Sequence, residues 1–224
     1  MTSVRRSYLP AAGKDWLLPL YDPLVKLIGG DRIRKVLLDQ ADLRPHDRVL
    51  DVGCGTGTLG LLIKRLYPGV EAVGLDPDPK ALTRARRKAR KAAVAIQFDQ
   101  GFSDDLPYHD SSFDRVFSSF MFHHLAPEEK EKTMREVQRV LKPGGTLHLV
   151  DFTESESDVR GSLVRVPHSS ERMKDNSEER ILILLRQAGF LRASRLTGGA
   201  MLFGQLQVSY FQASVNTGQA EGDQ

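Results

Sequence analysis

A glycine-rich turn between a predicted strand and a predicted helix constrains this 224-residue chain more than any other feature. Residues 48–53 read RVLDVG, a short apolar run typical of a buried strand. Helical spacing follows to about Tyr67, and Pro68-Gly69 ends it. Glycine lacks a Cβ atom, so glycines between a strand and a helix let the backbone approach a ligand closely. The stretch therefore predicts a strand–loop–helix unit with a ligand bound at the loop.

The same alternation of strand and helix continues along the chain. Further strands are expected at 72–76, 96–100, 113–120 and 146–152, and two closing strands within 191–213. Helices are expected to begin near Pro79, Pro127 and Ser177, and Leu141 is expected to face inward on the second of them. This order predicts an α/β fold, a Rossmann-like doubly wound sheet with helices on both faces. The sheet is expected to have seven strands, mostly parallel, with an antiparallel C-terminal hairpin.

The length of the chain suits one main domain with short additions. Residues 1–44 are expected to form an N-terminal helical cap in two pieces, the second capped by Asp31. Residues 45–213 would form the main domain, with a substrate lid near 153–176. The polar tail, 214–224, is expected to be disordered.

Composition excludes several classes of site. The net charge of +3 comes from 32 basic and 29 acidic residues, a balance too even to imply a nucleic-acid partner by itself, and such a partner is not expected. Cys54 is the only cysteine, so we expect neither a disulfide nor a cysteine-rich metal site. No apolar run is long enough to predict a membrane span, and a cytoplasmic location is expected. The basic run from Lys80 to Lys91 is interpreted as the solvated face of a helix rather than a phosphate grip.

Two glycine templates overlap in the loop itself. Residues 55–60 fit the dinucleotide fingerprint G-x-G-x-x-G, and residues 53–57 fit the tighter loop that binds S-adenosylmethionine. Asp76 ends the next strand and suits the ribose hydroxyls of either ligand. Asp51 discriminates between the two candidate ligands. A carboxylate at this position would repel the pyrophosphate of a dinucleotide but would suit the ammonium or sulfonium group of S-adenosylmethionine. The loop therefore favours S-adenosylmethionine, with S-adenosylhomocysteine as the product.

Several segments together resemble the class I S-adenosylmethionine-dependent methyltransferases. VLDVGCGTG at 49–57 and GLDPDP at 74–79 are similar to the first two motifs of that family. LPYHDSSFDRV at 106–116 and VLKPGG at 140–145 resemble later motifs of the subfamily that includes ubiquinone and menaquinone C-methyltransferases. The resemblance covers roughly residues 21–152 and implies methyl transfer to a small, partly apolar molecule. The segment after VLKPGG departs from the quinone enzymes and leaves the acceptor open, as it leaves the oligomeric state.

Other functions on this fold remain as alternatives. A nucleic-acid or protein methyltransferase is one, although the stretch after the fourth strand reads SSFM rather than the Asn-Pro-Pro-Tyr of amino-directed DNA enzymes. A non-catalytic S-adenosylmethionine-binding protein is another, because its loop would look the same. A nicotinamide oxidoreductase is disfavoured by Asp51 and the closing strands.

The resemblance places the donor along the loop and the carboxyl ends of the following strands. The implied donor-binding residues are Asp51, Gly53, Cys54, Gly55, Thr56, Gly57, Asp76, Pro77, Phe102, Ser103, Ser119 and Phe120. Phe102 stands where relatives carry an acid that reads the adenine amino group. We therefore expect Phe102 to stack on the adenine, with Ser103 or a backbone carbonyl at its edge. Cys54 is expected to be a small packing residue rather than a nucleophile.

The acceptor side is predicted from the histidines and the aromatic residues near the expected lid. His123 and His124 follow the fourth strand and are candidates for a general base if the acceptor is a hydroxyl. Alternatively they cap the next helix or cover the donor. Trp16, Tyr21 and His168 are expected to line the acceptor side and exclude water. No metal is expected.

Overall fold

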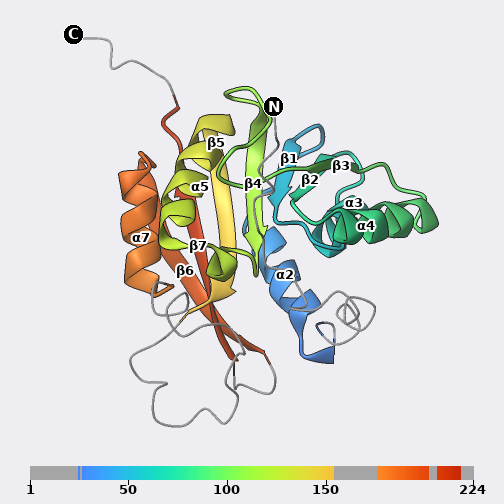
Figure 1. Ribbon diagram of the computed structural model, residues 1–224, viewed down its shortest axis with the longest axis horizontal. Coiled ribbons are helices and arrows are strands. Elements are labelled where there is room, and N and C mark those ends of the chain that lie inside the picture. The colour runs from blue at the N-terminus through green and yellow to red at the C-terminus, as the bar shows by residue number, and fades with distance from the viewer. Residues whose placement is uncertain (1–24, 26, 154–175, 202–205, 218–224) are drawn as a thin grey trace, which may run out of the picture.

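A seven-stranded sheet organises the molecule, which the computed structural model describes at residue 25 and over residues 27–153, 176–201 and 206–217 (Figure 1). Its strands are β1 (Arg48–Val52), β2 (Glu71–Asp76), β3 (Gln97–Gln100), β4 (Phe113–Ser119), β5 (Leu141–Phe152), β6 (Arg192–Met201) and β7 (Leu206–Ser214). They lie in the order β3-β2-β1-β4-β5-β7-β6. The first five are parallel, while β7 runs antiparallel between β5 and β6. The predicted sheet and its closing hairpin are confirmed.

Helices cover both faces of this sheet, as predicted. They are α2 (Gly30–Asp39), α3 (Thr58–Leu66), α4 (Pro79–Lys91), α5 (Pro127–Val140) and α7 (Glu178–Gln187), with a short 3₁₀ turn, η2 (Phe122–His124). Successive side chains of a strand point to opposite faces, and the two large apolar clusters follow this rule. Leu50 belongs to the cluster that holds Met134 of α5 and Leu184 of α7, whereas Val49 packs with Leu37 of α2. The two clusters are the cores on either side of the sheet.

The basic helix α4 packs through its small apolar residues. Ala81, Leu82, Ala85 and Ala89 are buried, while most of its cationic side chains are exposed. Lys88 is one exception, because its Nζ atom donates to Thr58 Oγ1 at 2.9 Å. The outward face is therefore the solvated face that the sequence predicts.

Three boundaries differ from the sequence prediction. Gly29, with φ of 98°, precedes α2 and makes no side-chain cap, so Asp31 lies within the first turn rather than at the cap. Strand β5 begins at Leu141 and includes the expected PGG turn, because residues 141–145 already pair or turn alongside β4. Leu141 is consequently a buried strand residue rather than the end of α5.

Most of the predicted cap, lid and tail lies outside the described residues, which omit 1–24, 154–175 and 218–224. Within the described part of the chain, no helix has both the length and the apolar character needed to cross a membrane.

Candidate functional site

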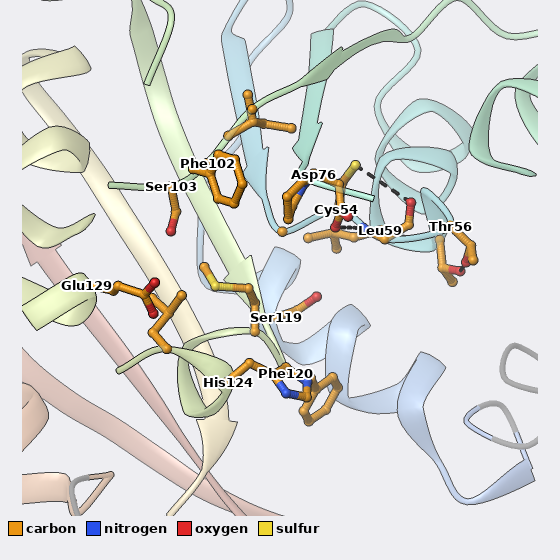
Figure 2. A pocket seen from close by; sticks show the side chains of 18 of the residues that line it. Cys54, Thr56, Leu59, Asp76, Phe102, Ser103, Ser119, Phe120, His124 and Glu129 are labelled. Atoms are coloured by element: carbon orange, nitrogen blue, oxygen red, sulfur yellow. Dashed lines mark hydrogen bonds between the residues drawn. The ribbon is translucent and has the colours of Figure 1, made fainter. Parts of the chain in front are cut away.

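A cavity of about 270 Å³ lies at the carboxyl ends of the central parallel strands, where ligands bind in sheets of this kind (Figure 2). It is lined by residues from the loops after β1, β2, β3 and β4 and from the helices α2, α3 and α5. The predicted donor residues among them are Gly53, Cys54, Gly55, Thr56, Asp76, Pro77, Phe102, Ser103, Ser119 and Phe120. The structure thus brings together predicted donor residues that are up to 67 positions apart in the sequence, from Gly53 to Phe120.

The glycine-rich loop is packed too tightly for larger residues at Gly53. Its φ is 72°, and a Cβ atom added there would lie 2.2 Å from Met121 Cγ. The Gly53 and Cys54 amides both donate to the Leu75 carbonyl, at 2.8 and 2.9 Å. These bonds hold the loop against the end of β2, so the loop presents its backbone to the cavity.

Asp76 fixes the neighbouring turn as well as facing the cavity. Its Oδ2 atom accepts from the Gly55 amide at 2.8 Å, and Oδ1 accepts from the Asp78 amide at 2.9 Å. Burial is the main cause that raises the pKa of Asp76, to about 6. The two hydrogen bonds from backbone amides lower the pKa and so act against this rise. The carboxylate is therefore fixed in place before any ligand arrives.

Asp51 is buried behind the loop and is not among the described residues that line the cavity. Its exposed fraction is 2%, and its Oδ1 atom has no hydrogen-bond partner among the described residues. Burial raises the pKa of this carboxyl to about 7, whereas the positive charge of Arg34 lowers it. Arg34, which the sequence analysis missed, lines the cavity from α2. A buried positive and a buried negative group therefore lie at the same end of the site.

Phe102, Ser103 and Glu129 lie on the side of the pocket opposite the glycine-rich loop (Figure 2). Ser103 Oγ lies 2.8 Å from Thr133 Oγ1, and Glu129 Oε2 accepts from the Ala126 amide at 2.8 Å. The sequence analysis missed Glu129, although Ala126-Pro127-Glu128-Glu129 has the spacing of a helix start with an acid in its first turn.

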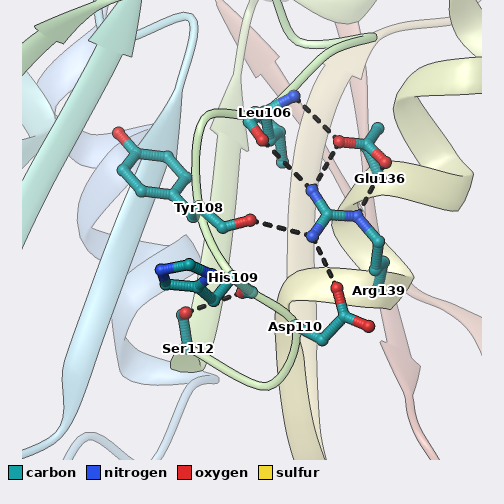
Figure 3. A network of polar contacts seen from close by, with 7 residues as sticks. All are labelled: Leu106, Tyr108, His109, Asp110, Ser112, Glu136 and Arg139. Carbon is teal, nitrogen blue, oxygen red and sulfur yellow. Dashed lines mark hydrogen bonds and ion pairs between the residues drawn. The ribbon is translucent and has the colours of Figure 1, made fainter.

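A network on α5 fixes the loop that follows Phe102 and Ser103 (Figure 3). Arg139 donates to the carbonyls of Leu106 and Tyr108, at 3.1 and 2.8 Å, and to Asp110 Oδ1 at 2.7 Å. Glu136 Oε2 accepts from Arg139 at 2.7 Å and from the Leu106 amide at 2.8 Å, and the hydrogen bond from Arg139 is the main cause that lowers the Glu136 pKa. The LPYHD stretch is therefore a structural motif that anchors one wall of the cavity.

The two candidate histidines take different positions. His124 lines the cavity, whereas the exposed fraction of His123 is only 4%. His123 Nδ1 lies 2.5 Å from Asp151 Oδ1, and its backbone amide donates to Asp151 Oδ2 at 3.0 Å. The two imidazole rings are 4.1 Å apart between centroids. Asp151, buried one residue before the end of β5, was missed, although it lies near the carboxyl end of a strand as Asp76 does. The His124 ring therefore lies against the ring of His123, which is held in place by Asp151.

The remaining predicted residues lie elsewhere. Gly57 precedes α3 and is not among the described cavity residues, and Trp16, Tyr21 and His168 lie outside the described residues. Burial raises the pKa of the Cys54 thiol well above its usual range, which agrees with a packing role. In the described ranges, no group of three or more His, Cys, Asp or Glu residues is placed to hold a metal ion.

Comparison with known proteins agrees with this geometry. Residues 49–145 match a family model described as "Methyltransferase domain". The chain is 37% identical over 153 residues to the demethylmenaquinone methyltransferase of Thermus thermophilus, an alignment that covers 67% of this chain and 69% of that protein. This chain belongs to the class I S-adenosylmethionine-dependent methyltransferases. A 2-phytyl-1,4-beta-naphthoquinone methyltransferase from Arabidopsis thaliana is 32% identical over 151 residues, covering 64% of this chain and 57% of that protein.

Solved structures share the fold of this methyltransferase. YcgJ from Bacillus subtilis superposes with a TM-score of 0.66 and 21% identity, over 83% of this chain and 98% of that one. The [4+2]-cyclase SpnF gives a TM-score of 0.72 at 20% identity, over 95% of this chain and all of that one. Because a protein titled a cyclase has the same fold, structural similarity by itself does not identify the reaction.

Proposed function

We propose that this methyltransferase transfers the methyl group of S-adenosylmethionine to an acidic hydroxyl of a small, partly apolar molecule. The observation that carries this proposal is the position of His124, which faces the donor cavity and rests on the His123–Asp151 pair. An imidazole beside the reacting atoms is a suitable acceptor for a hydroxyl proton.

The cavity residues fit the donor. Asp76 would accept hydrogen bonds from the ribose hydroxyls, and Phe102 would stack on the adenine. The glycine-rich loop would pack against the methionine portion, because Gly53 leaves room that any Cβ atom would fill. When bound, the donor supplies an electrophilic methyl group on a positive sulfur. The task left to the protein is to hold the acceptor oxygen in line at roughly 3 Å and to remove its proton.

The histidines would divide that task. In the Nδ1–H tautomer His123 would donate to the Asp151 carboxylate, which would hold the His123 ring and the tilted His124 ring beside it in place. His124 would take the hydroxyl proton while the oxygen attacks the methyl carbon. His123 and Asp151 are therefore positioning residues in this scheme, and His124 is the catalytic residue.

The names of relatives support an oxygen-bearing ring system as the acceptor. Two act by name on quinone-type molecules, and a third, from Amycolatopsis mediterranei, is a 27-O-demethylrifamycin SV methyltransferase, 35% identical over 123 residues, covering 54% of this chain and 44% of that protein. We infer a phenol or quinol of similar apolar character for this chain. The single buried thiol, Cys54, is compatible with a reducing compartment, and we expect the reaction in the cytoplasm.

The test is to incubate the full chain with methyl-labelled donor and a matched panel of phenols, quinols, amines and thiols. Label is expected in a hydroxyl or quinol product. His124→Gln should lower kcat by roughly 100-fold or more and flatten its pH profile, with the donor Kd unchanged. His109→Gln, an exposed histidine away from the cavity, is the matched control. Label in amines or thiols alone, or full activity of His124→Gln, would contradict the proposal.

A further inference from the structure

Strand β5 loses its neighbour β4 before β5 itself ends. The two strands pair as far as Ser119 opposite Val150, and the next residue, Phe120, donates its backbone amide to the Val150 carbonyl at 3.0 Å. Backbone groups two residues apart in a strand point to the same side. The amide and the carbonyl of Phe152 therefore face the position that β4 has left, where they need other partners.

Two side chains supply those partners. The Phe152 amide donates to Asp151 Oδ1 at 2.7 Å, and Asn176 Nδ2 donates to the Phe152 carbonyl at 2.5 Å. The Asp151 oxygen that accepts from Phe152 also lies 2.5 Å from His123 Nδ1. The rings of Phe152 and His123 meet edge to face, with 5.3 Å between their centroids and 70° between their planes. Phe152 therefore contacts the histidine and its carboxylate through both its amide and its ring, and Asn176 holds Phe152.

Asn176 is held in turn by the start of α7. It directly precedes Ser177, whose Oγ atom accepts from the Arg180 amide at 3.2 Å and caps that helix. Glu178, in the same turn, accepts a hydrogen bond from Ser209 of β7, the strand that pairs with the end of β5. The start of α7 is thus attached to the sheet, and it fixes the position from which Asn176 reaches β5.

The other polar atom of the Asn176 side chain indicates that packing alone does not explain this residue. Asn176 is completely buried, with an exposed fraction of 0%, and its Oδ1 atom has no hydrogen-bond partner among the described residues. An unpartnered buried carbonyl lowers the stability of the fold, and an apolar side chain of similar size, such as leucine, would avoid that cost. The feature of asparagine that this position uses is its N–H donor.

We propose that Asn176 is a positioning residue, which acts through Phe152 to hold the imidazole of His123 in the orientation that methyl transfer requires. Without the Asn176 donor, the Phe152 carbonyl would turn towards another partner, and the Phe152 amide would leave the Asp151 carboxylate. His123 would then lose its fixed orientation, and so would the His124 ring beside it. The inference rests on the proposed role of His124 as the base, but not on the identity of the acceptor.

The experiment compares the full wild-type chain with Asn176→Leu, which keeps the size of the side chain and removes its amide. Proton NMR gives the imidazole N–H signal of His123, identified as the signal that His123→Gln lacks, and this signal should shift or disappear in Asn176→Leu. With a hydroxyl acceptor from the panel above, kcat should fall by roughly 10- to 100-fold, while the acceptor KM and the Kd of S-adenosylhomocysteine change by less than about 3-fold. Asn216→Leu, at an exposed asparagine after β7, is the matched control and should leave all of these quantities unchanged.

Each other outcome counts against the proposal. Absence of the His123 signal from wild type, or an unchanged signal in Asn176→Leu, would show that Asn176 does not hold the ring, whatever the acceptor is. A folded variant in which kcat and donor affinity fall together would assign Asn176 to general structure. If Asn176→Leu fails to fold, Asn176→Ala is measured in the same way, and unfolding of both variants would make Asn176 a structural residue only. Full activity of His124→Gln would instead refute the proposed base, and the NMR comparison would still decide whether Asn176 positions His123.

Discussion

Replacing Asp51 with asparagine should stabilise the donor-free protein while weakening donor binding. Asp51 has an exposed fraction of 2%, and its Oδ1 atom lacks a hydrogen-bond partner among the described residues. Arg34 attracts its negative charge and Asp76 repels it. The charged form of Asp51 is therefore poorly supported until a cationic ligand arrives, which is the situation expected of a site that favours binding over stability.

The pKa of Asp51 sets the size and sign of the effect. Burial raises the pKa of Asp51 from 3.8 to about 7, which corresponds to at most about 4 kcal/mol of stability. Between these two values the native state binds more protons than the unfolded state, so the free energy of unfolding falls as pH rises through this window. Asparagine does not titrate. Because its amide is also buried, we expect a gain of about 1–4 kcal/mol at pH 8 that vanishes near pH 4.

Urea denaturation at several pH values from 4 to 8 measures this difference directly. The stabilities of wild type and Asp51→Asn should be equal near pH 4, separate progressively between pH 4 and 7, and differ by a constant amount above pH 7. Asp76 also has a raised pKa, about 6, so some slope should remain in the variant. Glu128→Gln, an exposed acid on α5, is the control and should leave the curve unchanged. Parallel curves for wild type and Asp51→Asn would refute the reasoning, because they would show that Asp51 does not titrate in this window.

Three further predictions concern the donor cavity. Asp76→Ala should weaken binding of S-adenosylhomocysteine by at least about 1.5–3 kcal/mol in calorimetry, because the carboxylate also holds two loop amides; an unchanged Kd in a folded variant would contradict the role. Phe102→Ala should weaken donor binding by at least about 0.5–1.5 kcal/mol through loss of stacking on the adenine, and Phe102→Tyr should be nearly neutral. A lowered melting temperature of Phe102→Ala with normal donor binding would identify Phe102 as a packing residue only. Gly53→Ala should lower both the melting temperature and the donor affinity, since its Cβ would lie 2.2 Å from Met121 Cγ, and normal values for both would show that the loop can relax.

The order of elements was predictable because local rules determine it. Apolar runs gave the parallel strands, Pro127 and Ser177 marked two helix starts, and Ser177 Oγ does accept from the Arg180 amide at 3.2 Å. The errors fell where backbone pairing overrides local preference. The PGG turn was expected to precede its strand, yet Leu141 already pairs with Phe113 of β4 before that turn. Such pairing depends on a distant segment, so local composition does not reveal it.

The residues of the candidate site were likewise only partly predictable from the sequence. Carboxylates at strand ends were found for β1 and β2 by one rule, that ligands bind beyond the carboxyl ends of parallel strands. Asp151 near the end of β5 obeys that rule and was open to the same reading. Recognising Arg34 required a different rule. Ile33, Leu37 and Leu38 define the buried stripe of α2, and Arg34 lies at helical spacing within that stripe. A long charged side chain inside an apolar stripe needs a partner that the helix itself does not supply. Within the described residues Asp31 lies 4.0 Å from Arg34, and Arg34 also acts electrostatically on the buried Asp51 of β1, so the surroundings of Arg34 depend on a distant segment that local composition does not reveal.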